Sequence, residues 1–128
     1  MFKEIKSGKD IKEFLDKTNS LHDGYMIGVQ YENKGISKTE YAHYFDSEKT
    51  GLRLRILVTS ICDAVVEIEF EDILEWQIKD NQSEITGTSV IISDQRYIIW
   101  SDDVFSNTAE LDKGSFVIAK SMKWRIAG

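Results

Sequence analysis

The sequence contains no proline, a single cysteine and no apolar run long enough to cross a membrane. Without proline, no turn relies on a φ angle fixed by a pyrrolidine ring. A membrane helix needs roughly 20 mostly apolar residues, so we expect no membrane association. Secreted domains usually carry paired cysteines, and the first residues, MFKEIKSGKDIKEF, lack the apolar core of a secretory signal. Both observations predict a cytoplasmic protein.

The local signatures of common enzyme sites are also missing. The chain has no P-loop, no dinucleotide glycine pattern, no G-x-S-x-G, no C-x-x-C and no H-E-x-x-H. These absences exclude the phosphate, hydride and zinc sites that such motifs form, although not a site assembled from scattered residues. We expect no cofactor.

The charge is acidic and unevenly distributed. A net charge of −6 with a pI near 4.9 argues against nucleic-acid binding, which usually needs a basic patch for the phosphates. Residues 56–78 include six acids and no base, whereas the chain from residue 113 onward has three lysines and Arg125 but no acid. Two interpretations remain open: an acidic surface for a basic partner, or acidic and basic strands that neutralise each other within one sheet.

A chain of 128 residues fits a single domain, 1–128, that buries about two thirds of the surface its unfolded chain exposes. Short alternating apolar segments dominate, and long helical crossovers between them are missing. The predicted fold class is α+β, mainly β. One N-terminal helix packs on a curled antiparallel sheet of about seven strands, as a small sandwich or a partly open barrel.

Residues 51–78 specify their own pairing as a hairpin. Alternate positions are apolar in both halves: Leu52, Leu54, Ile56 and Val58, then Val66, Ile68 and Phe70. One register, with Val58 opposite Ala64, satisfies both faces. It pairs Ile56 with Val66, Leu54 with Ile68 and Leu52 with Phe70 on one face, and Arg55 with Glu67 and Arg53 with Glu69 on the other. A slip by one residue would expose aliphatic side chains at about 1.5 to 3 kcal/mol each, so burial sets the register.

The other elements are weaker. A helix is predicted over residues 7–19, capped by Ser7 or Asp10, with Ile11, Phe14 and Leu15 as its apolar stripe. Strands are predicted at 25–32, near 39–46, at 89–93 paired with 96–101, and at 115–127, and 102–113 is a weak segment. In the first strand, Tyr25, Ile27, Val29 and Tyr31 are expected on one face.

A bulge is expected at Glu71-Asp72, after which Leu74, Trp76 and Ile78 continue the inner face and Ile73 does not. In the second hairpin, Ile92 is expected opposite Tyr97. In the last strand, the side chains expected to point inward are Phe116, Ile118 and Met122, and those expected to point outward are Val117 and Ala119.

Two histidines are the candidates for chemistry. His22 beside Asp23, at a helix-to-strand turn, could act as a base or a metal ligand, or the pair could simply order the corner. His43, between Tyr41 and Phe45, could line an aromatic pocket or pack at the edge of the core. Trp76, Trp100 and Trp124 are core residues or line a groove, and an exposed groove shared with Tyr41 or Tyr44 would be a ligand or peptide site.

Three segments carry a family resemblance: SLHDGYMIGVQYE after the helix, VEIEFEDILEW, and the closing FVIAKSMKW. In layout the chain resembles small bacterial domains in which a Leu/Phe-His-Asp turn opens a curved antiparallel sheet, some of them similar to immunity proteins of polymorphic toxin systems. The resemblance implies a cytosolic, partner-binding role without catalytic residues. An acidic patch would then suit a basic toxin nuclease.

These observations predict a non-enzymatic domain that binds a protein or a small ligand, and the acidic charge favours a basic protein partner. Its most specific form is an immunity-type inhibitor, and the alternative is a small hydrolase or isomerase using His22, Asp23 and His43. We assign no catalytic residue and no metal ligand. The candidate binding residues are His22, Asp23, Tyr41, His43, Glu67, Glu69 and Trp76.

Overall fold

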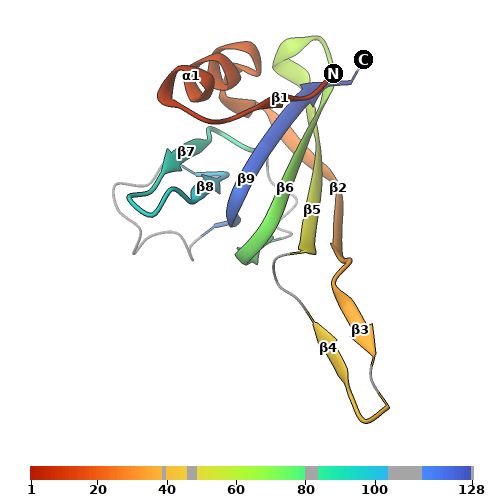
Figure 1. Cartoon of the computed structure of the whole chain (residues 1–128). Helices are drawn as coiled ribbons and strands as arrows, with labels where there is room; N and C mark the ends of the chain where they lie inside the picture. The colour runs from red at the N-terminus through yellow and green to blue at the C-terminus, as the bar shows by residue number, and fades with distance from the viewer. Residues whose placement is uncertain (39, 46–48, 80–83, 104–113, 128) are drawn as a thin grey trace.

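The computed structural model describes residues 1–38, 40–45, 49–79, 84–103 and 114–127 (Figure 1). Its elements are β1 (Lys3–Glu4), α1 (Gly8–Lys17), η1 (Asn19–Leu21), β2 (Gly24–Asn33), β3 (Ile36–Lys38), β4 (His43–Phe45), β5 (Thr50–Val58), η3 (Thr59–Ile61), β6 (Ala64–Gln77), β7 (Ser89–Ile92), β8 (Ile98–Ser101) and β9 (Phe116–Ile126).

One seven-stranded antiparallel sheet contains most of these strands, in the order β2-β5-β6-β9-β8-β7 with β1 paired to β9. β9 is the central strand, because β6 runs along one of its edges while β8 and then β1 occupy the other. The sheet is curled and open, and α1 covers one end of it (Figure 1). The predicted fold class, mainly β with one packed N-terminal helix, is confirmed.

The N-terminal helix forms as its cap predicts. The Ser7 hydroxyl accepts a hydrogen bond from the Asp10 backbone N–H at 3.4 Å, and the Asp10 carboxylate accepts one from the Lys6 backbone N–H at 2.9 Å. These contacts satisfy backbone donors that have no partner within the helix. Phe14 is fully buried and meets Trp124 of β9 edge to face, with ring centroids 5.3 Å apart. The helix therefore anchors one end of the sheet.

The β5–β6 hairpin has the predicted register at every pair, from Val58 opposite Ala64 to Leu52 opposite Phe70. Leu54 and Ile68 are both fully buried, which defines an inner face of the sheet, packed against α1 and the β7–β8 hairpin. We call the opposite side the outer face. Because each core aliphatic side chain contributes about 1.5 to 3 kcal/mol when buried, this hairpin is a large part of the driving force for folding.

The inward–outward alternation of β6 and β9 shifts partway along. The inward positions predicted for Trp76, Ile78 and Met122 are confirmed, whereas the predicted orientations are wrong for Ile73, Leu74, Phe116, Val117, Ile118 and Ala119. The predicted bulge is present: Asp72 has a φ of 59° and the register shifts between Ile73 and Glu75. It turns Ile73 into the core and leaves Leu74 49% exposed. β9 compensates with two consecutive exposed residues, Lys120 and Ser121. Beyond them Val117 and Ala119 are buried, and Phe116 and Ile118 form a second apolar cluster with Ile99.

A bulge also breaks the predicted face of β2. The register shifts between Met26 and Gly28, so that Tyr25 pairs with Leu57 on the outer face while Tyr31 pairs with Leu52 on the inner face. The four side chains expected on one side of β2 are therefore divided between its two sides.

The β7–β8 hairpin is one residue out of the predicted register, because Ile92 pairs with Ile98 and not with Tyr97. The reason is a longer turn: the Ser93 carbonyl accepts from the Arg96 N–H at 2.9 Å, and Arg96 takes a left-handed φ of 69°. The region predicted as a strand near 39–46 contains the short β4, which pairs with the unpredicted β3 in a separate hairpin. Most of the weak segment 102–113 lies outside the described residues.

Candidate functional site

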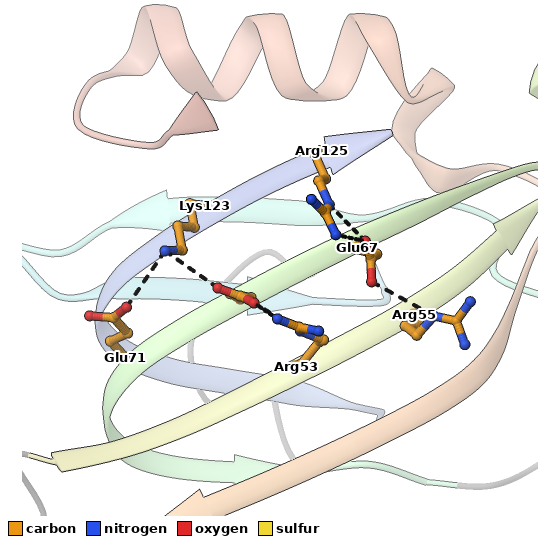
Figure 2. A network of polar contacts seen from close by, with 7 residues as sticks. Arg53, Arg55, Glu67, Glu71, Lys123 and Arg125 are labelled. Atoms are coloured by element: carbon orange, nitrogen blue, oxygen red, sulfur yellow. Dashed lines mark hydrogen bonds and ion pairs between the residues drawn. The ribbon is translucent and has the colours of Figure 1, made fainter. Parts of the chain in front are cut away.

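The outer face carries a ladder of ion pairs across three strands (Figure 2). Glu67 of β6 lies at its centre. Its Oε1 accepts a hydrogen bond from Arg125 Nε of β9 at 2.7 Å, and its Oε2 lies 3.8 Å from Arg55 Nε of β5. Glu67 is only 7% exposed, so the two guanidinium groups compensate a carboxylate that is almost withdrawn from water.

A second rung of the ladder is built around Glu69. Arg53 Nε donates to Glu69 Oε1 at 2.8 Å, and Lys123 Nζ lies 3.4 Å from Oε2 and 3.8 Å from the Glu71 carboxylate. Burial raises the pKa of the Glu69 carboxyl, but the hydrogen bonds and charges of Arg53 and Lys123 more than offset this, so that its pKa lies below the ordinary value. The ring of Phe2 lies against both cations of β9, Lys123 and Arg125, with its centroid 4.4 Å from the Arg125 guanidinium carbon.

Glu67 and Glu69 therefore take part in neutralisation within the sheet, the second of the two interpretations of the charge pattern. Two hollows flank the ladder, one between β2 and β5 and one beside the N-terminal segment, each with a volume of about 200 Å³. Both are smaller than the roughly 300 to 1,000 Å³ of typical small-molecule sites. The ion pairs of the outer face thus join β5, β6 and β9 and do not form a ligand pocket.

His22 and Asp23 stand at a corner where three segments meet. His22 Nδ1 lies 2.9 Å from the Thr86 carbonyl oxygen, so it carries the proton in that contact, and Nε2 lies 3.5 Å from Asp23 Oδ1. Ser60 Oγ donates to the His22 carbonyl at 2.6 Å, and the Thr59 hydroxyl donates to the Asp23 carbonyl at 3.0 Å. Most of these contacts are hydrogen bonds between side chains and backbone, which stabilise the turn.

The structure does not bring the second histidine to this corner. His43 belongs to β4, in the β3–β4 hairpin that extends from the end of the sheet opposite α1 (Figure 1), and its side chain lies outside the described part of the structure. Tyr41 lies in the same hairpin and is 89% exposed. His22 precedes β2, which is ten residues long and therefore spans about 30 Å. A site that uses His22, Asp23 and His43 together is not assembled. Within the described residues, no three His, Cys, Asp or Glu side chains gather as a metal site would require.

A different cluster is formed at the rim of the inner face. Tyr31 of β2 and Trp76 of β6 stack with ring centroids 5.3 Å apart and planes 22° from parallel. They remain 44% and 37% exposed. β5 separates their two strands in the sheet, so the rings meet only because β6 continues past the end of β5 and curls. Trp100 and Trp124, in contrast, are buried in the core.

β2 extends this rim with a row of exposed apolar side chains. Ile27 and Val29 are 48% and 42% exposed, and Tyr25, on the outer face, is 40% exposed. We call Tyr31, Trp76 and Val29 the aromatic rim. Sequence reasoning identified Trp76 but missed its partner Tyr31, because the bulge after Met26 has no strong sequence signal apart from Gly28. The alternation of apolar residues places Tyr31 on the same face as Tyr25 and gives no indication of a contact with Trp76.

No protein-family model, curated protein or solved structure matches this chain. No helix in the described ranges combines the length and apolar character needed to span a membrane.

Proposed function

We propose that the chain is a non-catalytic protein-binding domain whose contact surface is the aromatic rim together with the exposed side chains of β2. The stacked and exposed Tyr31–Trp76 pair carries this proposal. Tyrosine and tryptophan are enriched among the residues that dominate binding energy at protein interfaces, because they bury large apolar areas while losing few rotamers. A pair held by the fold is already in place for a partner.

The net charge indicates what kind of partner the domain binds. The net charge of −6 favours association with a basic partner, since complementary potentials raise the rate of encounter. Glu67 and Glu69 are candidate binding residues from the sequence, but their carboxylates are paired within the sheet. In this proposal they contribute to the net negative charge and do not contact the partner directly. An immunity-type inhibitor, as the sequence resemblance implies, is a specific form of this role.

The test is a capture experiment from native lysate with three immobilised proteins: the unchanged chain, Trp76→Ala and Ile91→Ala. Ile91 is a matched control, because it is 40% exposed on β7, at the other edge of the sheet. We expect a stoichiometric protein with the unchanged chain and with Ile91→Ala, and its loss with Trp76→Ala. Equal recovery by all three proteins, or no stoichiometric protein, would reject the proposal.

A further inference from the structure

β2 is a long edge strand with one side open. Nine of its ten residues pair with β5 along one edge, and Ile27 lies in the bulge. On the other edge, Gly24 meets Ile85: the Ile85 N–H donates to the Gly24 carbonyl at 2.7 Å, and the Asp23 N–H donates to the Ile85 carbonyl at 2.9 Å. In the described part of the chain no strand pairs with that edge over residues 25–33. Unpaired N–H and C=O groups in such a row are a template for an added strand.

The sequence of β2 protects this edge little. Natural edge strands are commonly blocked by lysine, by proline, by a bulge or by being very short. GYMIGVQYEN contains no lysine or proline, has one charged residue, Glu32, and is ten residues long. Its bulge between Met26 and Gly28 leaves residues 28–33 in continuous register with β5. β7, at the opposite edge of the sheet, is four residues long, so it offers a much shorter template.

The charges near β2 are acidic at its N-terminal end and mixed further along. At the N-terminal end Glu84 accepts a hydrogen bond from the Tyr25 hydroxyl at 3.3 Å. Arg55 of β5 pairs with Gly28, and at the C-terminal end Glu32 lines a hollow together with Lys34 and Arg53. A basic residue of an added segment would therefore meet an acid at the N-terminal end of β2, and the net charge of −6 favours a basic partner.

We propose that β2 binds an extended segment of a partner protein as an additional strand of the sheet. The segment carries apolar residues at alternate positions, which contact the aromatic rim, and a Lys or Arg at the end that lies beside Glu84. Backbone hydrogen bonds supply affinity in this mode, and the alternate side chains supply specificity. This inference rests on the proposed protein-binding function and specifies how the partner is recognised.

The probe is a random peptide display library selected on the full chain. Expected winners alternate β-branched or aromatic residues with polar ones and carry a basic residue near one end. The strongest peptide is then synthesised with a single N-methyl group at each backbone amide in turn. Since only alternate N–H groups of a strand face its neighbour, we expect affinity to fall about tenfold or more at every second position and to change little between them.

Two variants test the edge of β2, and the N-methyl series separates strand addition from contact with the aromatic rim, to which Val29 also belongs. Val29→Lys blocks the edge but leaves the Tyr31–Trp76 stack, and Ile91→Lys makes the same change on β7 as a control for folding, checked by thermal unfolding. Val29→Lys should abolish peptide binding and Ile91→Lys should preserve it. Failure to select peptides, or binding that N-methylation does not affect at any position, overturns strand addition. In the second case, a loss of binding in Trp76→Ala would leave the rim as a protein-binding surface.

A second copy of the chain is the competing occupant. Light scattering after size exclusion reports it directly: a dimer that Val29→Lys converts to a monomer would overturn the assignment to a partner protein. A monomer in both cases agrees with the inference, provided that the peptide results hold.

Discussion

Glu67 and Arg125 join the two longest strands of the sheet from its outer face, with 2.7 Å between Arg125 Nε and the Glu67 carboxylate, although 58 residues separate them in the sequence. Glu71 lies on the same strand as Glu67, but its side chain is 61% exposed and its contact with Lys123 is 3.8 Å long. The two glutamates therefore form a natural comparison between a buried and an exposed ion pair.

We expect Glu67→Ala to lower the free energy of unfolding by about 1.5 to 3 kcal/mol, because the hydrogen bonds of a charged and nearly buried group are lost. Glu71→Ala should change it by no more than about 1 kcal/mol, as is usual for exposed pairs. Urea unfolding followed by tryptophan fluorescence measures both. Equal effects of the two substitutions would contradict the role assigned to the ladder.

Glu69 predicts a dependence of stability on pH. Its carboxyl pKa in the folded chain is lowered from the ordinary value of 4.5, so the unfolded state binds more protons than the folded state near that pH. The stabilisation from its ion pairs is complete above about pH 4.5 and disappears as the pH falls through the lower, folded pKa. The difference in unfolding free energy between the unchanged chain and Glu69→Gln should shrink steadily below pH 4.5. A difference that grows on acidification would show that the sign is wrong.

Gly24 and Gly28 lie on the same strand but differ in their surroundings. A Cβ atom on Gly24 would lie 2.6 Å from the Leu21 carbonyl oxygen, whereas one on Gly28 would meet the methylene groups of Arg55 no closer than 3.5 Å. Gly24→Ala should therefore destabilise the protein by about 1 to 3 kcal/mol, as overpacking does, while Gly28→Ala should stay within about 0.5 kcal/mol of the unchanged chain. Thermal melting of the two variants compares them directly.

Arg96 is exposed in the β7–β8 turn with a left-handed φ of 69°, a conformation that costs a residue with a Cβ atom roughly 1 to 2 kcal/mol. Arg96→Gly should remove this strain and leave a net stabilisation of about 0.5 kcal/mol or more, after the larger chain entropy of glycine in the unfolded state is subtracted. Gln95→Gly, next to it but without a positive φ, should be neutral or destabilising. A lower melting temperature for Arg96→Gly than for Gln95→Gly would refute this explanation.

The sequence predicts the fold best where both faces of a strand constrain it. In β5 and β6, aliphatic pairs such as Leu54–Ile68 and charged pairs such as Arg55–Glu67 require the same register, and the structure has that register. In β7 and β8 both faces are apolar, so burial does not distinguish registers that differ by one residue. The turn decides there, and its left-handed position is occupied by Arg96 where glycine would have been the recognisable signal.

The candidate site was harder to predict for the same reason. Asp72 adopts a left-handed φ, and the register shift beside it allows β6 to turn Trp76 towards Tyr31. The change in apolar alternation predicts the bulge at Glu71-Asp72 but not the direction in which it turns the strand, and alternation gives no sign of the bulge in β2. Trp76 could be singled out as a large aromatic residue, whereas Tyr31 becomes significant only after both strands have been placed in space.

The central place of β9 also determines when the sheet can form. β6 and β1 both find their partner in residues 116–126, which leave the ribosome after all the other strands. Domains with many such distant pairings fold slowly. During synthesis the apolar surface of the β5–β6 hairpin therefore stays exposed until β9 has been made. The nascent chain is then exposed to aggregation, and a chaperone that shields this hairpin until β9 arrives would raise the yield of folded protein.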